Sequence, residues 1–292
     1  MRLEVLKTYK IYIGGKFPRT ESGSYYKLKV ANKTVANVCQ CSRKDFREAV
    51  VIARKAQEGW NEKSAFNRSQ ILYRIAEMLE GRKAQFIDEM QLMGISKSVA
   101  EKEVLSSVDR LVYFAGWCDK YQQVFSGVNP VASSHFNFSV NEPMGVIASL
   151  APESTPLLGL VSIIAAQISG GNSSVVLASE KYPLTAITFA EVLNSSDVPG
   201  GVVNILTGFR KELVEHFSIH MDVNAVVYCG TDKKEIGLIQ KNAATNMKRV
   251  SIYSDKEVLA DEFENPYEIL KSQEVKTTWH PIEKIGGASP SY

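Results

Sequence analysis

The stretch from residue 144 to residue 254 constrains the fold most, because short apolar runs alternate there with longer helical patterns. The apolar runs predict buried strands at 144–151, 173–178, 202–207, 223–229 and 248–254. Helices are expected between them, at 157–168, 183–194, 210–217 and 232–245. Strands joined through helices lie parallel, and right-handed crossovers place helices on both faces of one sheet. We therefore expect an α/β fold with a Rossmann-like core over 144–254, an open parallel five-stranded sheet whose ligand crevice lies at the carboxyl ends of its strands.

The region before the sheet, residues 1–134, predicts a hairpin followed by long amphipathic helices. The alternation of Tyr9, Ile11 and Ile13 before a Gly-Gly pair indicates a hairpin over 8–19. Apolar residues at helical spacing predict helices over 42–60, 65–91 and 98–123. This N-terminal segment is expected to pack on the sheet.

Two further strands flank the core. Alternating side chains predict half-buried strands at 135–143 and 274–282. Residues 255–273 have mixed polarity and contain Pro266, so we expect a connector with at most one short helix. Residues 283–292 are rich in Gly, Ser and Pro and are expected to form a flexible tail.

Composition excludes several functional classes. The formal net charge of +2 gives no electrostatic footprint for nucleic acid. The longest apolar run is too short for a membrane span, and the N-terminus lacks the apolar core of a signal peptide. The spacing of the cysteines fits neither a disulfide framework nor a metal site, so we expect a reducing, cytoplasmic location. These cysteines are Cys39, Cys41, Cys118 and Cys229.

Several segments together resemble the aldehyde dehydrogenase family. The resemblance covers about residues 5 to 254 and the C-terminal strand. It is carried by TYKIYIGGKF (8–17), ARKAQEGWNEKSAFNRSQILYRIAEMLEGRK (53–83), EPMGVIASLAPESTPLLGL (142–160), GGNSSVVLASEKYPLTAITFAEVL (170–193), VPGGVVNILTG (198–208), NMKRVSIYS (246–254) and VKTTWHP (275–281).

The resemblance implies a cysteine nucleophile, hydride transfer to NAD(P), and a glutamate that activates water. An asparagine side chain would hold the oxyanion in the loop after the first core strand, where this chain has Ser154 beside Glu153. Tyr253 stands at the position of the glutamate. The nucleophile would lie in a domain after the fifth strand, but no cysteine follows Cys229. We therefore expect the catalytic domain to be absent, with the connector in its place.

The resemblance also places cofactor contacts at two loops. The loop after the second strand, which would bind the adenosine ribose, offers Glu180 and a displaced Lys181. The loop after the fourth strand offers Gly230 and Thr231 to a pyrophosphate at a helix N-terminus. Asp232 would repel that phosphate. Binding of NAD or NADP is expected to be weak or lost.

Three functional hypotheses follow. In the first, the chain is non-catalytic and associates with a full-length aldehyde dehydrogenase relative, or with itself, through the oligomerisation strands 135–143 and 274–282. In the second, it binds NAD(P) and a partner's catalytic domain completes an oxidoreductase that converts aldehyde to acid. In the third, it is a fragment without function, an interpretation that the intact C-terminal strand disfavours.

Overall fold

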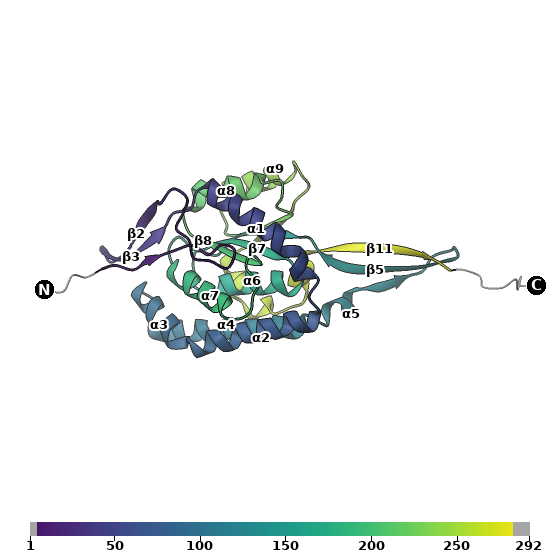
Figure 1. The fold of residues 1–292 in the computed structure, drawn as a ribbon, viewed down its shortest axis with the longest axis horizontal. Helices are drawn as coiled ribbons and strands as arrows, with labels where there is room; N and C mark the ends of the chain where they lie inside the picture. The colour runs from purple at the N-terminus through teal and green to yellow at the C-terminus, as the bar shows by residue number, and fades with distance from the viewer. Residues whose placement is uncertain (1–4, 283–292) are drawn as a thin grey trace, which may run out of the picture.

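A five-stranded parallel sheet forms the centre of the computed structural model, which describes residues 5–282 (Figure 1). In spatial order its strands are β10 (Arg249–Tyr253), β9 (Ala225–Cys229), β6 (Val146–Leu150), β7 (Ser173–Leu177) and β8 (Val203–Leu206). Every neighbouring pair is parallel. Because β6, β7 and β8 are buried along their whole length, their sequences are apolar runs rather than alternating ones. The predicted fold class is confirmed.

Helices cover both faces of this sheet. One face carries α1 (Arg43–Asn61), α8 (Arg210–Ile219) and α9 (Lys233–Ala243). The other carries α6 (Leu158–Ser169) and α7 (Leu184–Asn194), with an outer layer of α2 (Ala65–Gly81), α3 (Lys83–Leu92) and α4 (Lys97–Trp117). Every residue of α6 is buried, because this helix lies between the sheet and α4. No helix within residues 5–282 has the length and apolar character that a membrane crossing requires.

The long predicted helices are interrupted. The helix expected over 65–91 ends at Gly81, and α3 begins after Arg82, whose side chain bonds Gln85 and Glu191. The helix expected over 98–123 ends at Trp117, before the short α5 (Tyr121–Phe125). Neither break follows a proline.

The N-terminal hairpin predicted over 8–19 forms only at its turn. A tight turn exists, since Ile13 and Lys16 pair across two glycines with positive φ. Its flanks pair elsewhere, however, because β1 (Thr8–Tyr9) runs parallel to β3 (Lys33–Cys39) and Tyr12 bridges to β8. A hairpin that was not predicted, β2 (Tyr25–Val30) with β3, completes this small sheet.

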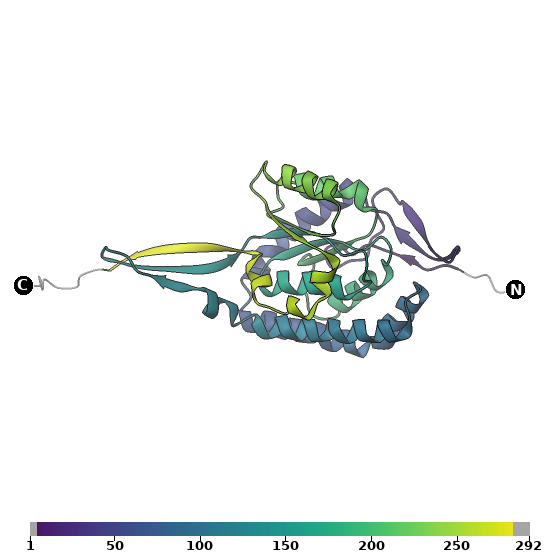
Figure 2. The same cartoon turned by 180° about the vertical axis from the view of Figure 1, so that it is seen from behind.

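A third sheet, antiparallel throughout, projects from the body as an arm (Figures 1 and 2). The arm consists of β4 (Gly127–Asn129), β5 (His135–Pro143) and β11 (Gln273–Pro281), with β5 in the middle. The strand expected at 135–143 is β5, and the strand expected at 274–282 lies one residue earlier. The tail predicted at 283–292 lies outside the described residues.

The connector is more structured than the sequence suggested, and the expectation of at most one short helix is wrong. It contains α10 (Asp255–Leu259), the 3-10 turn η1 (Asp261–Phe263) and α11 (Tyr267–Leu270). Val258, Phe263 and Ile269 are buried, and α10 and α11 both contact α6. The sequence has no helical period here because each helix is only about one turn long.

Arg110 of α4 holds the connector through contacts with its backbone and side chains. This guanidinium is 1% exposed. It donates through Nη2 to the carbonyl of Ala260 at 2.9 Å and through Nη1 to that of Val258 at 3.4 Å. Its Nε lies 3.3 Å from Glu264, and the group stands over the Phe263 ring. A buried charge held by carbonyl groups of one segment gives that segment a defined structure.

Candidate functional site: the crevice at the strand ends

A groove of about 530 Å³ lies at the carboxyl ends of β6, β9 and β10, where the sheet topology predicts a ligand crevice. Loops after these strands and the N-termini of α8, α9 and α10 form its walls. The residues that line it are Glu153, Arg210, Tyr228, Cys229, Gly230, Thr231, Asp232, Glu235, Ser254, Asp255 and Lys256.

The Glu153 carboxylate occupies the hydrogen-bond donors of the loop after β7, which was expected to bind a ribose. Its carboxylate accepts the backbone N–H of Glu180 at 2.9 Å and that of Lys181 at 3.3 Å. It also accepts the Ser179 hydroxyl at 2.8 Å. The donors at this turn are therefore bonded to a carboxylate of the chain itself.

Arg210, which the sequence analysis did not single out, crosses the crevice. Its guanidinium donates to the carbonyl of Cys229 at 2.8 Å and to that of Ala151, and it lies 3.4 Å from Glu153. It thus ties the ends of β6 and β9 together. Its position at the start of the helix predicted over 210–217 was the only signal in the sequence.

Two helix N-termini at the crevice are capped by carboxylates. Glu180 accepts the backbone N–H of Arg210, at the start of α8. Asp232 accepts the N–H groups of Lys234 at 2.7 Å and Glu235 at 3.2 Å, at the start of α9. The pKa of Glu180 is raised, chiefly by burial. Positions that favour an anionic ligand by their dipole are thus already occupied by anions.

Of the remaining predicted cofactor residues, Gly230 is paired within the chain, whereas Thr231 and Lys181 are exposed. The Gly230 N–H donates to the carbonyl of Tyr253 at 2.8 Å, so it is already paired. Gly230 has a φ of +158°, and a Cβ there would meet the Tyr228 hydroxyl oxygen at 2.8 Å and the ring carbon that bears it at 2.9 Å. Thr231 and Lys181 are exposed, and the Lys181 ammonium lies 4.8 Å from the centre of the Tyr182 ring.

Ser154 lies at the crevice, on its exposed rim. Its backbone N–H donates to Asp255 at 3.0 Å. The Asp255 carboxylate thus lies at the residue where the resemblance expects an oxyanion donor, and Glu153, the neighbour of Ser154 in the sequence, carries a second carboxylate. Two negative charges there oppose the development of a third.

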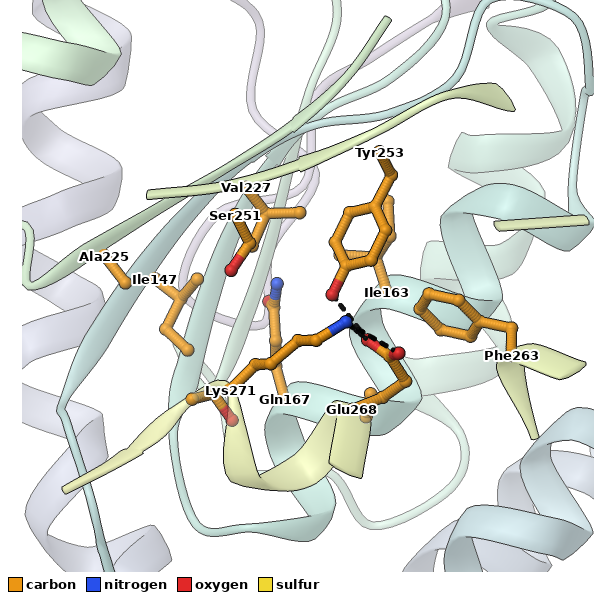
Figure 3. A pocket seen from close by; sticks show the side chains of 12 residues that line it. Ile147, Ile163, Gln167, Ala225, Val227, Ser251, Tyr253, Phe263, Glu268 and Lys271 are labelled. Carbon is orange, nitrogen blue, oxygen red and sulfur yellow. Dashed lines mark hydrogen bonds and ion pairs between the residues drawn. The ribbon is translucent and has the colours of Figure 1, made fainter. Parts of the chain in front are cut away.

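Tyr253 is part of the connector's packing (Figure 3). Its hydroxyl donates to Glu268, its ring packs on Phe263 with centroids 5.5 Å apart, and Lys271 lies 4.7 Å from the ring centre. Burial, followed by the Glu268 charge, raises the pKa of this hydroxyl. A small cavity on one side of it measures about 20 Å³, room for a single water, and a wider hollow of about 390 Å³ opens between Tyr253 and the connector. Tyr253 therefore holds the connector in place, and its burial disfavours the phenolate form.

No thiol in the described chain is placed for nucleophilic attack. All four cysteines are buried. Cys229 ends β9 near the crevice, and burial raises its thiol pKa, which disfavours the reactive thiolate. Within residues 5–282, no group of three or more His, Cys, Asp or Glu side chains is arranged to hold a metal ion.

Comparison with known proteins places this arrangement in context. The model described as "Aldehyde dehydrogenase family" matches residues 22–253. The putative aldehyde dehydrogenase DhaS of Bacillus subtilis is 30% identical over 253 residues, which are 84% of this chain and 50% of that protein. Omega-crystallin of Enteroctopus dofleini is 29% identical, over 85% of this chain and 50% of its own length. The chain thus spans about half the length of these curated relatives.

Solved structures agree with the sequence comparisons. The NAD+ complex of an aldehyde dehydrogenase from Bacillus cereus superposes with a TM-score of 0.80 at 25% identity, over 85% of this chain and 51% of that one. The apo form of an indole-3-acetaldehyde dehydrogenase superposes with a TM-score of 0.79 at 27% identity, over 84% of this chain and 57% of the other.

Proposed function

Because the chain belongs to the aldehyde dehydrogenase family, we propose that it is a non-catalytic member that acts by associating with a full-length relative. The observation that carries the proposal is the arm. From Glu274 to Pro281 every residue of β11 is exposed, and its outer edge pairs with no other strand in the described chain. In the family that this chain resembles, the corresponding strands meet the catalytic domain of a neighbouring subunit. A free edge of this kind is a template for a strand of a partner.

The crevice supports the non-catalytic part of the proposal. Ser154 is flanked by carboxylates, Tyr253 is bonded to Glu268, and Cys229 is buried. The connector occupies the position at which the resemblance expects the catalytic domain to be inserted. A fragment without function would not be expected to retain a buried arginine that fixes this segment. The free cysteines fit a reducing compartment, and we place the protein in the cytoplasm.

Weak or lost binding of NAD and NADP belongs to the same proposal. The anion-binding positions of the crevice are taken by Glu153, Glu180 and Asp232. A dinucleotide would have to displace these carboxylates and place its own phosphates near them.

A second candidate function is an NAD(P)-binding oxidoreductase component that a partner's catalytic domain completes. The groove of about 530 Å³ at the strand ends favours it, as does the likeness to a structure solved with NAD+. Titration calorimetry with NAD+ and NADP+ separates the two candidates. We expect no heat and no thermal shift at millimolar cofactor, whereas saturable binding would favour the second candidate.

The association is tested by mixing. The purified chain and a full-length relative from the same organism are combined and resolved by size-exclusion chromatography with light scattering. We expect a complex that Trp279→Lys in the arm abolishes. Val99→Lys on α4 is the matched control, because Val99 is 54% exposed and Trp279 58%. Absence of a complex with any relative, or aldehyde turnover by the purified chain alone, would overturn the proposal.

A further inference from the structure

We propose that two copies of this chain pair through β11, antiparallel and with Thr277 on the two-fold axis, so that two arms form one continuous sheet. This inference rests on the proposed function, which makes the arm the association surface. It adds a second partner for the same edge: the chain itself, when no relative is present.

The edge of β11 is long enough for such pairing. β11 has nine residues, paired on one side along its whole length with β5. From Glu274 to Pro281 its other side faces solvent and presents backbone groups without a partner strand among residues 5–282, whereas Gln273 is buried and its carbonyl accepts a hydrogen bond from Arg249. The opposite edge of the arm, β4, has only three residues.

Full overlap of two antiparallel β11 strands fixes one register. The exposed residues Glu274 to His280 then pair with His280 to Glu274 of the second copy, and the middle residue, Thr277, lies opposite its own equivalent. At the two ends Gln273, whose carbonyl is bonded to Arg249, and Pro281, which has no N–H, add no hydrogen bond between the strands. In this register Val275 faces Trp279 of the second copy, and symmetry repeats the pair. Both side chains are exposed in the single chain, at 67% and 58%. Pairs of an aromatic and a β-branched residue directly across strands are among the favourable ones.

The charges along the edge select the same register. Within one chain Glu274 lies directly opposite Glu142 of β5, which is an unfavourable pair of like charges. With Thr277 on the axis, Glu274 has Glu142 of β5 on one side and His280 of the second copy on the opposite side. Moving the axis to Thr278 sets Lys276 against His280, and moving it to Lys276 sets two lysines against each other. Both shifts lose the acid–imidazole pair.

The shape of the molecule permits this arrangement. The arm extends beyond the body in both views (Figures 1 and 2), so a two-fold axis at its middle places the two bodies at opposite ends. A register with the axis closer to Gln273 would drive the tip of each arm against the other body, because at Gln273 the chain comes out of α11, which packs on the body, and enters the strand.

Cysteine cross-linking tests the register. Residues directly opposite in an antiparallel pair have Cα atoms about 4.5–5.5 Å apart, within the disulfide range of about 4.4–6.8 Å. The full chain carrying Thr277→Cys should form a disulfide-linked dimer under mild oxidation. Lys276→Cys and Thr278→Cys, two exposed neighbours, should stay monomeric. The native cysteines are buried and do not compete. Preferential cross-linking at 276 or 278, or at no position, would overturn the inference.

Charge exchange tests the pairing itself by sedimentation velocity. Glu274→Lys and His280→Glu should each weaken the dimer about five- to tenfold, since each change affects two symmetric pairs. The double variant should restore the affinity. Failure of this rescue would refute the register.

The two proposals fail separately. If the chain binds a full-length relative but never forms a dimer with itself, only this inference is overturned. A chain that cross-links at Thr277→Cys but binds no full-length relative removes the proposed function.

Discussion

Replacing Arg110 by methionine should destabilise the protein by about 3 kcal/mol. The hydrogen bond to the Ala260 carbonyl, at 2.9 Å with a charged donor, contributes about 1.5–3 kcal/mol. The bond to Val258 is long, at 3.4 Å, and adds less. Glu264 is 31% exposed, so solvent screens its ion pair with Arg110 and loss of that pair adds little to the destabilisation. Methionine keeps most of the packing against Phe263, so the lost polar contacts dominate.

The assay is thermal unfolding combined with hydrogen exchange of the connector. A loss of about 3 kcal/mol corresponds to a melting temperature roughly 6 °C lower for a chain of this size. Exchange should rise over α10, η1 and α11 before it rises in the sheet. Arg74→Met is the matched control, because Arg74 is 52% exposed and its partner Asp197 is 70% exposed; about 0–1 kcal/mol is expected. Equal losses in the two variants, or an exchange increase spread evenly over the body, would refute the reasoning.

Three further predictions concern the crevice and the core. Tyr253→Phe should cost about 1 kcal/mol of stability in urea unfolding, through its lost bond to Glu268. Tyr253→Glu should yield no aldehyde oxidation, and measurable turnover would contradict the structural role given to this residue. The double change Glu153→Gln with Asp232→Asn keeps a hydrogen-bond acceptor at each position but removes two negative charges. Calorimetry should then detect NAD+ binding at least about fivefold tighter than in the unmodified chain. An unchanged affinity would argue that these carboxylates do not repel the cofactor. Burial raises the pKa of Glu89 above its ordinary 4.5, so the folded chain retains a proton that the unfolded chain releases, and stability falls as pH rises from about 4.5 through the folded-state pKa. Glu89→Gln should abolish this slope in melting curves, and a persisting slope would assign it to other groups.

The parts of the fold that the sequence predicted are those in which burial leaves a pattern. Strands such as β6 and β7 are covered on both faces, so their sequences are unbroken apolar runs. The β2–β3 hairpin was missed although β2 carries a period-two pattern, in which Tyr26, Leu28 and Val30 alternate with lysines and face the body. The end of α2 at Gly81 was missed because the bonds of Arg82 to another helix are tertiary contacts.

The candidate site was predictable in place but not in detail. The topology located the crevice, and the resemblance identified Ser154, Glu180, Gly230 and Tyr253. The contacts that define their present state join residues far apart in the chain, such as Glu153 with Ser179 and Tyr253 with Glu268. Local pattern carries no information about such pairs, so the occupied anion positions became visible only in the structure.

The packing of the connector has a consequence for the evolution of this chain. An ancestor with a longer insertion after β10 could lose it, but the reverse step is now obstructed. Reinserting a lobe after Tyr253 would strip Val258 and Ile269 from α6 and leave the charge of Arg110 without its carbonyl partners. Each intermediate on that route would be less stable than the present form.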